Sequence, residues 1–223
     1  MKSVTAEQKR RAQTVATLLD EIIPNPNAAL DYRSPFALLI ATLLSAQCHD
    51  EQVNRVMPAF LKRAPSPEAA CALSEAEIGK IIHSCGFFRV KARYIATLSR
   101  QLCENFNGNV PDDFSSLESL AGIGHKTASV VMGYAFGHPT FPVDTHVHRL
   151  ALKWRLSEGS VERVEADLKQ LFPKRDWFRR HIQMRLPMGE STVIAWCVRQ
   201  EGCVGYVGCW VVYDTYCFSP SVP

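Results

Sequence analysis

The chain has 223 residues, 47% hydrophobic and 21% charged, a composition typical of a globular protein with one core or two modest lobes. Its formal net charge of +3 is compatible with a nucleic-acid partner but does not indicate one alone. No apolar run reaches the roughly 18 residues of a membrane-spanning helix, and the N-terminal segment lacks the features of a secretion signal. We therefore expect a cytoplasmic protein.

The first half of the chain shows helical periodicity. Apolar residues form stripes over 15–23 and 53–61, whereas 36–44 is apolar on every side, which predicts a helix at the centre of a core. Ser74 and Glu77 form a capping box ahead of an apolar stripe over 78–85, and Gly86 is placed to end that helix. A further helix is expected to reach the turn at Asn107-Gly108.

The second half continues the helical pattern. Ser115 with Glu118 forms another capping box, which predicts a short helix ending at Gly122. The next helix should run from Gly124 to Gly137, followed by helices at about 145–155, 160–171 and 176–186. No stretch alternates convincingly enough for a sheet, so we predict an all-α fold.

Basic residues and cysteines are distributed unevenly. Residues 174–185 carry five basic side chains against one acidic, which fits a solvated helix face as well as a nucleic-acid contact. Four cysteines within helical patterns are expected to be small core residues: Cys48, Cys71, Cys85 and Cys103. Four more crowd the C-terminal end, where a reducing compartment favours a metal site over disulfides: Cys197, Cys203, Cys209 and Cys217.

The segment LAGIGHKTASVV at 120–131 predicts two short helices joined by Gly122-Ile123-Gly124. Glycines allow a tight turn and the close approach of another molecule, while Ile123 should fill the space between the helices. The second helix would direct free N–H groups outward, which suits a phosphate oxygen and reads no base sequence. Two glycines alone are a weak indication of such a hairpin.

Two charged residues beside this hairpin could carry chemistry. Lys126 lies in the first turn of the second helix, where a cation is disfavoured, and a neutral amine can form a Schiff base. Asp144 is placed at the start of the following helix. A structural reading stays open, in which Asp144 only caps that helix and Lys126 is a surface charge.

The run LAGIGHKTASVVMGYAFGHPTFPVDTHVHR at 120–149 resembles the helix-hairpin-helix, glycine–proline loop and aspartate signature of the endonuclease III family. Three upstream segments are similar to family motifs: LLSAQCHD at 43–50, CGFFRVKA at 85–92 and NGNVP at 107–111. The likeness covers about residues 10–185 in the same order.

The resemblance implies a DNA glycosylase fold of two helical lobes with a DNA-binding cleft between them. Residues 28–138 would form a six-helix barrel domain with the hairpin at about 115–136, residues 1–27 and 139–186 the second lobe, and residues 187–223 an atypical cysteine-rich tail. The implied partner is double-stranded DNA that contains damaged bases or abasic sites, bound by a monomer associated with the nucleoid.

The implied activity is base excision repair by a DNA glycosylase and abasic-site lyase. Lys126 would attack C1′ of a nucleotide with an oxidised pyrimidine, and the Schiff base would lead to β-elimination on the 3′ side without a cofactor. Asp144 would help to deprotonate the amine and stabilise charge on the sugar. A mismatch or alkylation glycosylase of the same fold remains an alternative, as does a DNA-binding module without catalysis.

The resemblance also implies a set of DNA contacts. Gln47 would fill the space that the flipped base leaves, and Phe87 would wedge against the opposite strand. Structural alternatives are a hydrogen bond of Gln47 within its own loop and a place for Phe87 in the core. His146 could equally be a structural partner of Asp144. The remaining contacts would come from Gly122, Gly124, His125 and Thr127.

The C-terminal cysteines depart from the family. Endonuclease III closes with C-x6-C-x2-C-x5-C around a [4Fe–4S] cluster, whereas this chain has C-x5-C-x5-C-x7-C, which leaves the cluster doubtful, although four thiolates could still hold iron–sulfur or zinc. Residues 187–223 also carry only four of the 47 charged residues. Reading the codons of 187–193 one base earlier permits His-Gly-Arg-Glu-Tyr-Cys, the family's lead-in to its first cysteine. We therefore hypothesise a frameshift near residue 185.

Overall fold

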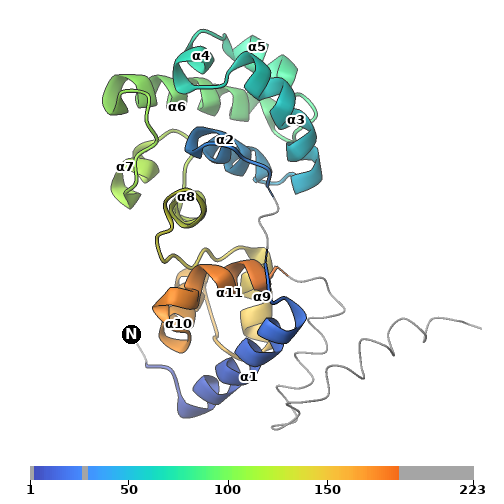
Figure 1. Cartoon of the computed structure of the whole chain (residues 1–223), viewed down its shortest axis with the longest axis vertical. Coiled ribbons are helices and arrows are strands. Elements are labelled where there is room, and N and C mark those ends of the chain that lie inside the picture. Colours follow the sequence, from blue (N-terminus) through green and yellow to red (C-terminus); the bar gives the residue numbers. More distant parts are fainter. Residues whose placement is uncertain (1–2, 27–29, 186–223) are drawn as a thin grey trace, which may run out of the picture. The chain divides into compact units, whose positions relative to one another are not determined.

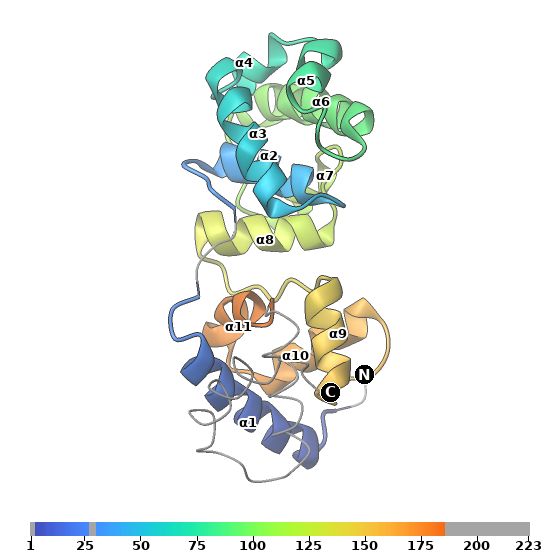
Figure 2. The same ribbon diagram turned by 90° about the vertical axis from the view of Figure 1, so that its right-hand side faces the viewer.

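The computed structural model describes residues 3–26 and 30–185, and every regular element in these ranges is helical. This confirms the all-α prediction. The chain divides into two compact units, unit 1 from Met1–Asn27 with Val143–Pro223 and unit 2 from Ala28–Pro142 (Figures 1 and 2). Within the described ranges, no helix is long and apolar enough to cross a membrane.

Unit 2 is built around the apolar helix α2. Every residue from Phe36 to Leu44 is buried, as its uniformly apolar sequence predicts. Helix α2 packs against α3, α6 and α8, and α6 also covers α4 and α5 (Figure 1). The helices of this unit are α2 (Pro35–Ser45), α3 (Asp50–Arg63), α4 (Pro67–Cys71), α5 (Glu75–Ile81), α6 (Phe88–Phe106), α7 (Phe114–Ser119) and α8 (His125–Phe136).

Some of the helix ends predicted in unit 2 are confirmed and others are corrected. Ser74 and Glu77 form the expected capping box of α5. That helix nevertheless ends at Ile81, before Gly86, because the chain turns at Ile82, whose carbonyl accepts the Cys85 N–H at 2.9 Å. The cap of α7 is Asp113 rather than Ser115. Its carboxylate accepts the Ser116 N–H at 2.8 Å and complements the helix dipole.

The expectation for the first four cysteines is only partly right. Cys85 is buried and Cys48 and Cys103 are half-buried, but Cys71 is exposed. Cys71 is the last residue of the five-residue helix α4, where the apolar contacts are made by other residues, and its sulfur lies 3.5 Å from that of Cys103. Helical periodicity cannot place a residue at the end of so short a helix.

Unit 1 has its own core, made of α1 (Ala6–Ile22), α9 (Thr145–Lys153), α10 (Val161–Leu171) and α11 (Trp177–Gln183), with a 3-10 turn at Lys174–Asp176. Helix α1 packs on α10 and α11, and α10 on α9. The fully buried side chains come from all parts of the described unit and include Val15, Leu18, Leu19, Val147, Leu150, Trp154, Val164 and Leu168.

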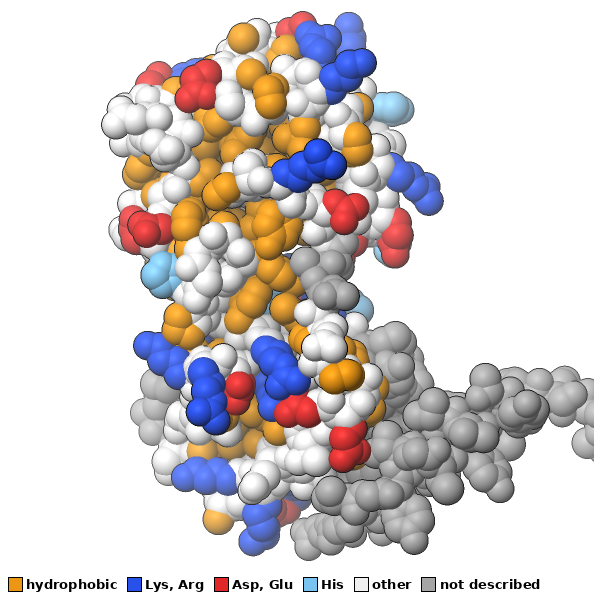
Figure 3. Space-filling model, viewed as in Figure 1, with side chains coloured by type: hydrophobic (Ala, Val, Ile, Leu, Met, Phe, Trp, Pro, Cys, Tyr) orange, Lys and Arg blue, Asp and Glu red, His pale blue; other side chains and the backbone are white. Residues whose placement is uncertain are grey.

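The basic segment 174–185 is not a uniform solvated face. Lys174 and Arg175 are exposed, but Arg180 is buried and donates to both carboxylate oxygens of Asp20 in α1, at 2.6 and 2.9 Å. Gln183 adds hydrogen bonds to the carbonyls at the end of α1. Arg180 of this basic segment thus joins α11 to α1. On the face of unit 1 in Figure 3, the visible Lys and Arg side chains are interspersed with Asp and Glu.

Candidate functional site

The connection between α7 and α8 is a hairpin that needs a glycine at its first turn. Gly122 has φ of +78°, and a Cβ on it would lie 2.6 Å from the Tyr94 ring. Ile123 is only 5% exposed and belongs to the core cluster of unit 2 together with Leu117 and Ala128. The predicted role of Ile123 in filling the space between the helices is therefore confirmed.

Helix α8 begins at an open glycine. A Cβ on Gly124, the N-cap residue, would meet no atom within 4 Å, and the first turn contains no acidic residue. Backbone N–H groups at this end carry the positive end of the helix dipole. Lys126 is exposed in the same turn, and Thr127 beside it is half-buried. The arrangement combines N–H donors suited to an oxyanion with an accessible primary amine.

His125 is held over the hairpin from two sides. Its Nδ1 lies 2.7 Å from a carboxylate oxygen of Glu118 in α7, and its ring stacks on Phe114 at a centroid distance of 5.3 Å. Sequence reasoning missed both partners, because Phe114 belongs to no motif and Glu118 was assigned to a capping box with Ser115 that the structure does not form. Their effect is to orient the imidazole at the start of α8.

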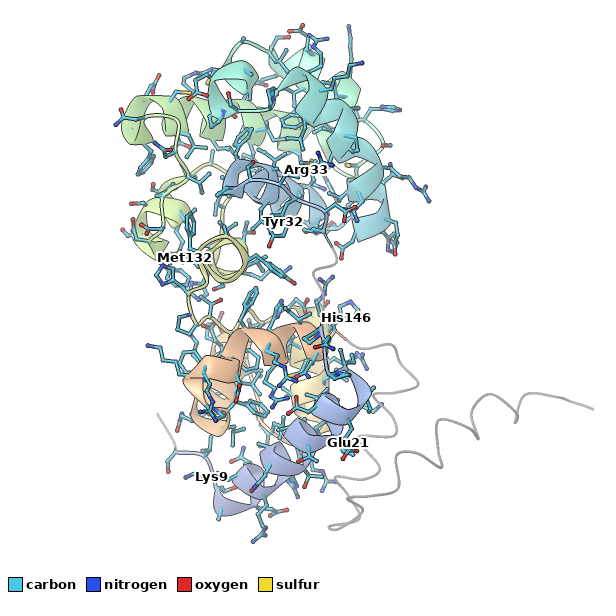
Figure 4. The ribbon with its side chains drawn as sticks, viewed as in Figure 1. Lys9, Glu21, Tyr32, Arg33, Met132 and His146 are labelled. Carbon is cyan, nitrogen blue, oxygen red and sulfur yellow. The ribbon has the colours of Figure 1, made fainter. Side chains whose placement is uncertain are left out.

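Asp144 is the N-cap of α9, as the sequence predicted. One carboxylate oxygen accepts the Val147 N–H at 2.8 Å, and the other lies 3.8 Å from Nε of Arg185. The side chain is only 13% exposed, so the carboxylate is held rather than mobile. The contact with Arg185 has no sequence signal, because the two residues are far apart in the chain. His146 follows, exposed in the first turn of α9 (Figure 4).

Gln47 and Phe87 both project from turns with left-handed backbones, with φ of 52° and 57°. Non-glycine residues adopt this conformation rarely and at a cost. Phe87 is 65% exposed, so the core reading of this side chain is wrong, and Gln47 is exposed as well. The two turns lie against each other, since a Cβ on Gly86 would lie 3.1 Å from the carbonyl oxygen of Gln47.

The described part of the chain contains no group of three or more His, Cys, Asp or Glu side chains that could hold a metal ion. The proposed metal ligands Cys197, Cys203, Cys209 and Cys217 lie outside the described residues. Four thiols are the donor set of a [4Fe–4S] cluster, but their spacing does not fit the family's cluster loop. The chemistry that Lys126 and Asp144 can offer does not require a cluster.

Comparison with known proteins shows which family has these features. Residues 40–174 match the model of the "HhH-GPD superfamily base excision DNA repair protein". Endonuclease III of Synechocystis sp. is 42% identical over 181 residues, which cover 79% of this chain and 83% of the relative. Endonuclease III of Escherichia coli K12 is 40% identical over 166 residues, which cover 74% and 79%. The chain belongs to the endonuclease III family.

Solved structures of endonuclease III have the same fold. A trapped endonuclease III–DNA covalent intermediate matches 78% of this chain and 84% of its own, with a TM-score of 0.75 and 38% identity. A non-covalent endonuclease III–DNA complex matches 81% and 84%, with a TM-score of 0.76 and 37% identity. As an endonuclease III family member, the chain is a base excision repair enzyme, a DNA glycosylase and abasic-site lyase with DNA as its substrate.

Proposed function

We propose that this enzyme removes oxidised pyrimidines from double-stranded DNA and then cuts the strand 3′ to the abasic site, with Lys126 as nucleophile. The observation that carries the proposal is the exposed primary amine in the first turn of α8, beside an open glycine N-cap. The backbone N–H groups of this turn would bind a phosphate of the damaged strand, which brings the amine to the adjacent sugar.

The reaction proceeds in two steps. The neutral Lys126 amine attacks C1′, the bond from C1′ to the base breaks, and the base leaves with the electron pair and takes up a proton. The sugar ring opens to a protonated Schiff base between Nζ and C1′. This cation acidifies the C2′ proton, whose loss expels the 3′ phosphate, and water then releases Lys126 as the free amine.

Asp144 is the proposed carboxylate partner of this reaction. It would accept a proton from the Lys126 ammonium and stabilise positive charge on the sugar. Its contacts within unit 1 support the assignment, because the Val147 N–H of α9 and the Arg185 guanidinium hold the carboxylate in place. Gln47, Phe87, His125, Thr127 and His146 are the proposed DNA contacts, together with Gly122 and Gly124.

Borohydride trapping tests the nucleophile directly. The full-length chain is mixed with a duplex that contains one abasic site, reduced with borohydride and resolved under denaturing conditions. We expect a covalent protein–DNA adduct with the wild type and none with Lys126→Ala, because only the amine can form the reducible imine. The variant should keep the wild-type melting temperature, since Lys126 is exposed. An equal adduct yield from Lys126→Ala contradicts the assignment.

A further inference from the structure

The CGFFRVKA segment contains a buried lysine that the proposed chemistry does not use. Lys91, in the first turns of α6, is only 5% exposed. Its Nζ donates to the carbonyl oxygen of Leu44 at 2.8 Å, near the C-terminal end of α2. Its backbone N–H donates to the carbonyl oxygen of Phe87 at 3.1 Å. This backbone bond is the ordinary i→i−4 bond of α6, so it is the Lys91 side chain that links the start of α6, directly after Phe87, to the helix that precedes Gln47.

The carbonyl of Leu44 is a suitable partner for a cation. The last carbonyls of a helix have no intrahelical partner and carry the negative end of its dipole. The thiols of Cys48 and Cys85 lie near the ammonium group, and burial lowers the pKa of Lys91 and raises that of Cys85 to about 11. A buried ammonium group is costly unless it is hydrogen-bonded, so breaking this contact should disturb the end of α2.

The turn that carries Gln47 and the turn that carries Phe87 also contact each other. The Gln52 side chain donates to the Ser84 hydroxyl at 2.7 Å, and a Cβ on Gly86 would approach the Gln47 carbonyl oxygen to 3.1 Å, closer than an ordinary contact. Gln47 and Phe87 both hold left-handed backbones, a conformation that persists only where its surroundings impose it. The Lys91 side chain joins α6, which follows the Phe87 turn, to α2, which precedes the Gln47 turn.

We propose that Lys91 is a positioning residue for base extrusion, which holds the Gln47 and Phe87 turns in one fixed arrangement. The inference rests on the proposed function, in which Gln47 and Phe87 enter the duplex while the target base leaves it. Lys91 does not touch DNA; it acts through the two turns. Its loss should slow removal of a base from a duplex and leave the Schiff-base chemistry of Lys126 unchanged.

The test compares Lys91→Met with wild type in the full-length chain. The first readout is single-turnover removal of thymine glycol from a duplex, and the second is borohydride trapping on a single-stranded oligonucleotide with one abasic site, where no duplex has to open. We expect removal from the duplex to slow by roughly 10- to 100-fold, as for other small displacements of substrate-positioning groups, with trapping unchanged. If wild type itself forms no adduct, the proposed function fails. If wild type forms the adduct and Lys91→Met removes the base at the wild-type rate, only this inference fails.

A double-mutant cycle separates positioning from general destabilisation. If Lys91 acts through Gln47, the change Gln47→Ala should slow wild type but add little in the Lys91→Met background. Rate losses that multiply in the double variant overturn the proposal.

If Lys91→Met does not fold, alanine substitutions at two glycines provide a second test of the same proposal. In Gly86→Ala the new methyl group would lie 3.1 Å from the Gln47 carbonyl oxygen, so the two turns would have to shift by a few tenths of an ångström, which should reproduce the slow removal. Gly79→Ala is the matched control, because its Cβ would make only ordinary contacts of 3.7–3.8 Å with Phe88 and Ala92. Equal rates of base removal by Gly86→Ala and Gly79→Ala would contradict the proposed role of the Gln47 and Phe87 turns.

Discussion

At the scale of single residues, the hairpin depends on one backbone conformation. Gly122 adopts a positive φ and leaves room for the Tyr94 ring, so both backbone and space exclude a side chain there. Gly124, two residues later, has an extended backbone and open space. The sequence shows the same G-x-G pattern at both positions, and only the structure separates their roles.

This difference predicts that alanine substitutions at Gly122 and Gly124 change the stability of the protein by unequal amounts. We expect Gly122→Ala to destabilise the protein by more than about 1 kcal/mol, because the methyl group strains φ and collides with Tyr94. Gly124→Ala should cost less, roughly 0.5–1 kcal/mol, because the methyl group meets no atom but alanine is a poorer N-cap than glycine. Chemical denaturation of the two variants beside wild type measures both values. Equal stabilities would show that the turn relaxes around the added methyl group.

Asp144 combines a structural and a proposed catalytic role, and two substitutions separate them. Asn is as good an N-cap as Asp, so Asp144→Asn should fold with wild-type stability, whereas Asp144→Ala should lose about 1 kcal/mol through the cap. Both variants lack the carboxylate, and we expect both to lose roughly 100-fold or more in single-turnover base removal. Full activity in Asp144→Asn would contradict the proposed role of the carboxylate.

At the scale of elements, α1 and α11 are joined by side chains from opposite ends of the chain. Arg180 and Gln183 reach the last turn of α1 and bond to Asp20 and to backbone carbonyls there. Because the Arg180 side chain is only 6% exposed, its charge needs the carboxylate of Asp20. This link is formed within the described residues of unit 1.

The Asp20 contact predicts an acid-dependent loss of stability. The Arg180 hydrogen bond lowers the pKa of Asp20 from its ordinary value of 3.8, so its contribution is complete above that value and disappears as the pH falls through the folded-state pKa. We expect Asp20→Asn to cost roughly 1–3 kcal/mol near neutral pH, less than a fully buried pair because Asp20 is 39% exposed.

A matched control for this prediction is Glu21→Gln, which removes the same charge from an exposed neighbour. Urea denaturation between about pH 3 and 7 should show the stability difference between Asp20→Asn and wild type narrowing toward acid. A difference that does not change with pH would mean that the ionised carboxylate is not what stabilises the helix pair.

At the scale of the whole molecule, the net charge of +3 gives little general attraction for DNA. We nevertheless expect duplex affinity to fall by roughly 100-fold or more between about 50 and 200 mM salt, because phosphate contacts release counterions. Fluorescence anisotropy with an undamaged labelled duplex measures this dependence. A flat response would contradict a mode of binding dominated by phosphate contacts.

The frameshift hypothesis for residues 187–223 stays a prediction, because these residues lie outside the described part of the chain. The frameshift hypothesised near residue 185 lies either in the gene or in its sequencing, and resequencing the locus tests whether the neighbouring frame encodes His-Gly-Arg-Glu-Tyr-Cys. An undisturbed frame, shared by close relatives with the same tail, would rule it out. The family relation does not depend on this segment, because the matched superfamily region ends at residue 174.

The sequence by itself determined the helical class, the hairpin and the candidates Lys126 and Asp144, because periodicity, caps and glycine turns act between residues close in the chain. The position of Ile123 in the core and of Asp144 at a helix start followed from the same local rules. Tertiary structure decided what depends on distant partners: the exposure of Phe87 and Cys71, the Asp20–Arg180 pair, and the bond of Lys91 to Leu44. Such contacts form only when separate helices pack, so the spacing of residues along the chain does not predict them.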